Sequence, residues 1–257
     1  MKNRIHSLFE TKKEHILSLY FTAGFPNLND TLSILKNLEA GDVDMIEIGF
    51  PYSDPLADGP VIQQSSGQAI ENGMTLNLLF EQLQSLRSIT QKPIVLMGYL
   101  NVVLQFGEAA FIEKCAEVGV DGIIIPDMPL HYYISNFKAL CEKNQVSNVL
   151  LVTPETSEER IRQLDSYSSG FIYLVASNSI TGSTSGSTFR TDYYQRIQNM
   201  NLKNPHLIGF GVHDKKTFET VCKFGSGAII GSAFIKHLKE NGTSKASVEE
   251  FVNAIKG

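Results

Sequence analysis

Short apolar runs rich in β-branched residues recur along the whole 257-residue chain and alternate with segments whose apolar residues have helical spacing. Such alternation is typical of strand–helix–strand units with right-handed crossovers. We count eight predicted strands, and eight units in about 250 residues is the length of a (β/α)8 barrel. The predicted strands are residues 16–21, 45–49, 94–97, 122–125, 149–152, 171–175, 207–210 and 228–230.

The main competing architecture is an open, doubly wound sheet. Such a sheet usually has fewer strands at this length, and no G-x-G-x-x-G motif follows the first predicted strand. We therefore expect an α/β fold in which residues 1–257 form a single TIM-barrel domain. Ile5, Leu8 and Phe9 predict an extra N-terminal helix that covers the bottom of the barrel, and residues 61–72 predict another short helix.

Residues 177–189 consist almost wholly of Ser, Thr, Gly and Asn. One interpretation is a flexible linker between two domains. That division would leave a C-terminal piece with two strands, which is too small to bury its own core. We favour a lid over an active site, because the segment directly follows the sixth predicted strand, on the face where barrel enzymes place their chemistry.

The composition excludes several classes of protein. The net charge is −5 and the lysines are scattered, so a nucleic-acid-binding surface is not expected. No apolar run approaches the roughly 20 residues that cross a bilayer. The three cysteines are far apart and predict free, buried thiols in a reducing compartment, and the histidines lack metal-ligand spacing. We expect a cytoplasmic protein without a metal site, a membrane segment or a nucleic-acid partner.

Residues 47–60 read E-I-G-F-P-Y-S-D-P-L-A-D-G-P and contain two acids of interest. Glu47 lies in the middle of an apolar strand, where a carboxylate is costly to desolvate. Asp58 lies in a loop rich in Pro and Gly, so we expect it to be more polar and exposed. Two carboxyl groups in different surroundings are typical of acid–base chemistry on a small molecule. The alternative is that Glu47 pairs with a buried cation and the loop is only a rigid turn.

A phosphate site is predicted where the last strands end. Gly211 follows the seventh strand, and Gly231 and Ser232 follow the eighth, at the usual phosphate site of this fold. Backbone N–H groups at a helix N-terminus bind anions without Lys or Arg. Thr181 and Gly182 in the lid add further donors, although a turn explains each glycine taken alone.

The chain resembles the tryptophan synthase alpha subunit family over nearly its whole length. The motif of residues 47–60 carries most of the resemblance, and F-T-A-G-F-P, I-P-D-M-P, I-T-G, G-F-G-V and I-I-G-S-A extend it. The resemblance implies a lyase that cleaves indole-3-glycerol phosphate to indole and glyceraldehyde 3-phosphate in tryptophan biosynthesis. It also implies an α2β2 heterotetramer with a beta subunit, which carries pyridoxal phosphate, whereas this chain needs no cofactor.

The same resemblance assigns roles by position. It makes Glu47 and Asp58 the catalytic acids, and it places an arginine in many members where this chain has Ser177. The phosphate-binding positions that it implies are Gly182, Gly211, Gly231 and Ser232. The indole-pocket positions that it implies are Tyr20, Tyr99, Tyr173 and Phe210.

Two other functions remain open at this point. One is a different phosphate-binding barrel enzyme of amino-acid biosynthesis, which would place other acids or a lysine at the strand ends. The other is a non-catalytic subunit that binds a phosphate ligand and regulates a partner. Retention of both Glu47 and Asp58 argues against the second, because binding alone does not call for a buried acid.

Overall fold

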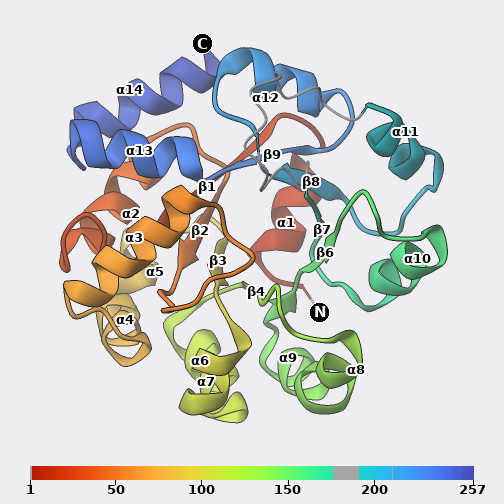
Figure 1. Ribbon diagram of the computed structural model, residues 1–257, viewed down its shortest axis with the longest axis horizontal. Helices are drawn as coiled ribbons and strands as arrows, with labels where there is room; N and C mark the ends of the chain where they lie inside the picture. The colour runs from red at the N-terminus through yellow and green to blue at the C-terminus, as the bar shows by residue number, and fades with distance from the viewer. Residues whose placement is uncertain (1, 176–190, 210) are drawn as a thin grey trace.

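A computed structural model describes residues 2–175, 191–209 and 211–257. Their strands are all parallel and form one sheet that curls into a nearly closed barrel, with helices around it (Figure 1). The predicted (β/α)8-barrel architecture is confirmed. The strands are β1 (Ile16–Thr22), β2 (Met45–Gly49), β3 (Ile94–Met97), β4 (Gly122–Ile124), β5 (Ser147–Asn148), β6 (Leu150–Val152), β7 (Ile172–Val175), β8 (His206–Gly209) and β9 (Gly227–Ile230).

The fifth predicted strand is divided in two. β5 pairs with β4, whereas β6 pairs with β7, and only Val149 separates them. The Val149 N–H donates a 3.0 Å hydrogen bond to the carbonyl of Ile123. The order of pairing among the described strands is β5-β4-β3-β2-β1-β9-β8-β7-β6. Since its two ends are neighbours in the chain, the barrel closes at Val149.

Helices follow most of the strands and form the outer layer (Figure 1). The extra helix predicted for residues 61–72 is α3, which begins one residue earlier because Pro60 is favoured in the first turn. No helix in the described part of the chain is long and apolar enough to span a bilayer. The helices are α1 (Arg4–Thr11), α2 (Asp30–Ala40), α3 (Pro60–Glu71), α4 (Leu76–Gln82), η1 (Leu83–Ser85), α5 (Leu86–Ile89), α6 (Leu100–Phe106), α7 (Glu108–Val118), α8 (Leu130–Tyr132), η2 (Tyr133–Phe137), α9 (Lys138–Asn144), α10 (Glu158–Tyr167), α11 (Thr191–Asn199), α12 (Lys215–Cys222), α13 (Ser232–Asn241) and α14 (Lys245–Lys256).

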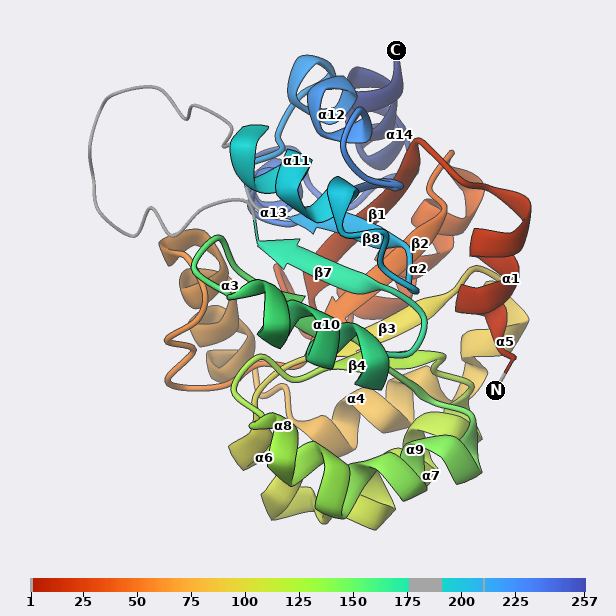
Figure 2. The ribbon, with the colours of Figure 1, turned by 90° about the vertical axis from the view of Figure 1, so that its right-hand side faces the viewer.

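Helix α1 lies across the end of the barrel where the strands begin, as predicted, and α3 lies at the opposite end (Figure 2). Asn3 caps α1 and also donates hydrogen bonds to the carbonyl of Asp121 and the hydroxyl of Ser147. The ring of Phe9 packs against Phe171, with ring centroids 5.9 Å apart. These contacts seal the bottom of the barrel and leave the other end for a site.

The three cysteines are free, as the sequence predicts. Cys115 and Cys141 are buried, whereas Cys222 is only half-buried. The predicted lid, residues 177–189, lies outside the described residues, so its role stays a prediction.

Candidate active site

Glu47 lies inside the barrel, where the two-residue period of β2 puts it on the same face as Met45 and Gly49. Its side chain is fully buried. The Oε1 atom accepts a 3.1 Å hydrogen bond from the hydroxyl of Ser18 in β1, and Oε2 has no hydrogen-bond partner among the described residues. Burial raises the pKa of Glu47 to about 8, against the opposing effect of the Ser18 hydrogen bond.

A protonated Glu47 therefore predominates at neutral pH, and its carboxyl group can donate a proton. Among the described residues no cation acts on Glu47, so the alternative of a buried ion pair has no support there.

Asp58 lies in the loop between β2 and α3 and is only 8% exposed, so the expectation of an exposed carboxylate is wrong. The loop turns tightly, with a 3.0 Å hydrogen bond from the Asp58 N–H to the Pro55 carbonyl, and Tyr99 covers the side chain. The Tyr99 hydroxyl donates a 2.9 Å hydrogen bond to Asp58 Oδ2. Burial raises the pKa of Asp58 to about 6, while the bond from Tyr99 opposes the rise. Asp58 is thus mostly ionised at pH 7.

Both acids line one cavity at the end of the barrel where the strands finish. The cavity has a volume of about 30 Å³, and the space reaches about 360 Å³ when the open solvent at its mouth is included. Four further residues of the sequence prediction also line it, namely Tyr20, Tyr173, Gly231 and Ser232. Sequence reasoning missed Ile62, Met97 and Ile229, which complete the lining. Met97 and Ile229 are at or near the ends of their strands, a position that could have identified them.

Two tyrosines of the predicted indole pocket fit only because a glycine faces them. A Cβ atom on Gly49 would lie 2.0 Å from the Tyr20 hydroxyl oxygen, and one on Gly209 would lie 2.1 Å from that of Tyr173. Burial raises the pKa of both tyrosines above the usual range, so both hydroxyls stay protonated. Tyr99 reaches the site through its bond to Asp58.

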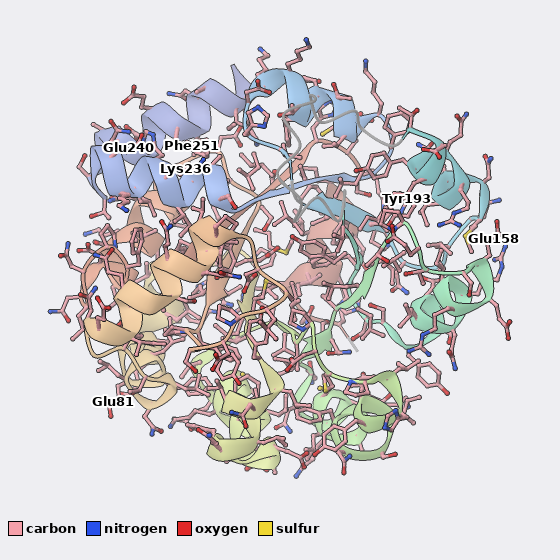
Figure 3. The ribbon with its side chains drawn as sticks, viewed as in Figure 1. Glu81, Glu158, Tyr193, Lys236, Glu240 and Phe251 are labelled. Atoms are coloured by element: carbon pink, nitrogen blue, oxygen red, sulfur yellow. The ribbon has the colours of Figure 1, made fainter. Side chains whose placement is uncertain are left out.

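The predicted phosphate residues fall at the start of α13. Gly231 precedes this helix and Ser232 is its first residue, so the cavity ends beside free backbone N–H groups. Gly211, with a φ of +76°, lies in an adjoining cleft that also includes Ser232. Lys236 and Glu240 of α13 and Phe251 of α14 line this second cleft (Figure 3). Ser177, Thr181, Gly182 and Phe210 lie outside the described residues, so their roles stay predictions.

Comparison with known proteins finds one family over nearly the whole chain. Residues 7–256 match the sequence model of the family described as tryptophan synthase alpha chain. A tryptophan synthase alpha chain from Flavobacterium psychrophilum is 56% identical over 254 residues, which is 98% of this chain and 99% of that protein. One from Flavobacterium johnsoniae is 54% identical and covers 99% of this chain and 100% of its own length.

Solved structures agree with the sequence relatives. Tryptophan synthase subunit alpha from Legionella pneumophila superposes with a TM-score of 0.88 at 26% identity, covering 100% of this chain and 98% of that one. A chain of the tryptophan synthase complex from Pyrococcus furiosus gives a TM-score of 0.83 at 31% identity, covering 95% and 98% respectively.

Proposed function

The chain belongs to the tryptophan synthase alpha chain family, and on that premise we propose that it cleaves indole-3-glycerol phosphate to indole and glyceraldehyde 3-phosphate. It is a lyase of tryptophan biosynthesis. One observation supports the proposed site above all: a buried, protonated Glu47 and an ionised Asp58 line the same cavity as the start of α13.

The reaction is a retro-aldol cleavage of the bond between indole C3 and the hydroxyl-bearing carbon of the side chain. Protonation at C3 turns the ring into an indolenine, whose cationic nitrogen accepts the bonding electrons. Glu47 donates this proton and takes one back from the side-chain hydroxyl. Its pKa of about 8 supports the role, because the acid form is available at neutral pH. The substrate supplies its own electron sink, so we propose that this chain needs no cofactor.

Asp58 acts on the ring nitrogen. Its carboxylate accepts a hydrogen bond from the indole N–H and stabilises the positive charge that develops there when C3 is protonated. A pKa of about 6 supports this role, because the ionised form predominates at pH 7. The two acids thus hold opposite protonation states at the same pH, as acid–base sites on small molecules require.

The walls of the cavity orient the substrate between the two acids. The rings of Tyr20 and Tyr173 and the side chain of Met97 supply apolar surface for the indole. The phosphate lies at the start of α13, where the N–H groups after Gly231 and the hydroxyl of Ser232 face an anion. Gly211, Gly182 and Thr181 bind the same group, and Phe210 and Tyr99 complete the indole pocket.

We further propose that the chain works with a tryptophan synthase beta subunit in an α2β2 heterotetramer, in the cytoplasm, with pyridoxal phosphate confined to the partner. The family membership supports a partner, and Leu56 offers a surface for it: its side chain is 82% exposed in the loop that carries Asp58. We also propose that residues 1–257 form one domain, because all described strands join one sheet.

The direct test is release of free indole from indole-3-glycerol phosphate by the purified chain, with and without a beta subunit. We expect indole and glyceraldehyde 3-phosphate in equal amounts, at a rate that the beta subunit increases. Absence of indole under both conditions would overturn the proposed activity. Activity that is unchanged by a beta subunit would overturn the proposal that the chain works with this partner.

A further inference from the structure

Ser18 is a polar residue in the middle of β1, between Leu17 and Leu19, and its side chain is fully buried. A buried hydroxyl without a partner is costly, so a serine here needs an acceptor. That acceptor is Glu47 Oε1, at 3.1 Å. Among the described residues this is the hydrogen bond that fixes the Glu47 carboxyl group.

The register of the two strands sets the direction of this contact. Ser18 pairs with Met45, two residues before Glu47, so it lies nearer the end of the barrel where the strands begin. The hydroxyl holds Oε1 from that side, while Oε2 lacks a hydrogen-bond partner in the described structure. The two oxygens of an isolated carboxylate are equivalent, so a proton can bind either one, whereas a hydrogen bond donated to Oε1 favours the proton on Oε2.

We propose that Ser18 is a positioning residue that anchors Glu47 through Oε1 and leaves Oε2 as the atom that exchanges a proton with the substrate. This inference rests on the proposed function of Glu47. In the donating step the O–H bond at Oε2 breaks and a C–H bond forms at indole C3. The negative charge left on Glu47 then strengthens the hydrogen bond from Ser18, which favours the transfer. Oε2 recovers its proton when it accepts the one on the substrate hydroxyl.

The groups around Glu47 make this role measurable. The described ionisable groups that interact with it are Tyr20 of β1 and Tyr173 of β7, and Asp58 shares the cavity. Both tyrosines stay neutral because burial raises their pKa. Asp58 titrates near pH 6 and Glu47 near pH 8. A loss of activity as the pH rises past neutral therefore reports Glu47.

The test compares the pH profile of kcat/KM for indole release in the unaltered chain and in Ser18→Ala. The bond from Ser18 lowers the pKa of Glu47, so its loss moves the falling limb of the profile to higher pH. We expect kcat to fall about tenfold, as for other hydrogen bonds to charged groups, while KM changes less than about twofold because no substrate contact is lost.

Ser65→Ala is the matched control. Ser65 lies in α3, and its hydroxyl is buried like that of Ser18. It bonds at 2.7 Å to Thr22, which lies in the same strand as Ser18, and no hydrogen bond joins it to Glu47. We expect the control to keep the falling limb in place. Ser18→Cys, of similar size but with a weaker donor, should move the limb in the same direction as Ser18→Ala and carries the test if the alanine variant does not fold.

An unchanged limb and an unchanged kcat in both Ser18 variants would overturn the inference while leaving the proposed reaction intact. If the unaltered chain released no indole, the proposed reaction would fail instead. In that case the hydrogen bond between Ser18 and Glu47 is tested by the pH dependence of the free energy of unfolding alone. Ser18→Ala should extend to higher pH the range over which the free energy of unfolding falls, and an identical pH dependence would overturn the anchor.

Discussion

The hydroxyl group of Tyr99 connects two loops of the active site: it donates a 2.9 Å hydrogen bond to Asp58 Oδ2 and accepts one of 3.0 Å from the Ala57 N–H. Tyr99 immediately precedes α6, whereas Asp58 precedes α3. The contact keeps the carboxylate of Asp58 over the cavity. It also offsets part of the rise in the pKa of Asp58 that burial causes.

Loss of this contact should change the acid side of the pH profile. Tyr99→Phe removes the donor, so the pKa of Asp58 rises above about 6 and a larger fraction of Asp58 is neutral near pH 6.5. We expect indole release at pH 6.5 to fall roughly fivefold relative to the unaltered chain, and this ratio to return towards one at pH 8, where Asp58 is ionised in both proteins. A loss of equal size at both pH values would contradict a role through ionisation.

The buried acid should reduce the stability of the protein at alkaline pH. The pKa of Glu47 is raised from 4.5 to about 8, so the folded state binds more protons than the unfolded one between these values. The free energy of unfolding should therefore fall as the pH rises from about 4.5 to 8, by on the order of 5 kcal/mol in total. In the Glu47→Gln variant the free energy of unfolding should not show this decrease.

Urea unfolding at pH 5, 7 and 9 measures the effect. The exposed Glu81 (Figure 3) supplies a matched variant, Glu81→Gln, which should keep the pH dependence of the unaltered chain. Equal slopes for the two variants would show that Glu47 does not titrate with a raised pKa.

The glycine opposite Tyr173 should not tolerate a side chain. In Gly209→Ala the new Cβ would lie 2.1 Å from the tyrosine hydroxyl oxygen, so the ring must move into the cavity. We expect a loss of about 1–3 kcal/mol in stability and a large loss of indole release. Gly67→Ala in α3 is the control, because nothing lies within 4 Å of its new Cβ atom. Thermal unfolding and the indole assay compare the two, and similar behaviour would argue against a tight tyrosine wall.

A negative charge at the start of α13 should separate phosphate binding from stability. Ser232→Asp places a carboxylate at the helix N-terminus, which usually stabilises a helix by about 0.3–1 kcal/mol. The same charge repels the substrate phosphate, so we expect KM to rise more than about tenfold while kcat at saturation changes little. Ser232→Asn is the neutral control. An unchanged KM in the aspartate variant would place the phosphate elsewhere.

Much of the barrel could be predicted from the sequence because its strands are buried. β2 and β3 begin and end at the predicted residues, since each is a short apolar run between polar or Pro and Gly residues. The division of the fifth strand at Val149 could not be predicted, because it depends on which neighbour each half pairs with. Local residue patterns carry no information about such long-range pairing.

The site was predicted less completely than the fold. Glu47 could be identified because an acid interrupts an apolar strand. The burial of Asp58 could not, because its loop is rich in Pro, Gly and polar residues, and the contact with Tyr99 joins residues that are 41 positions apart in the chain. Ser18 also carried a signal, a polar residue on the inner face of β1, but its meaning depends on the register that brings it to Glu47.

In the proposed reaction Glu47 supplies the proton that leads to cleavage of the carbon–carbon bond, and Glu47→Gln removes that proton donor. The measurement is indole release from indole-3-glycerol phosphate, together with the affinity of the variant for that substrate. We predict that affinity stays within a few-fold and that kcat falls by at least the 10²–10⁴-fold that general acid–base catalysis contributes. A folded variant that binds substrate and keeps more than a few per cent of the turnover would exclude Glu47 as the proton donor.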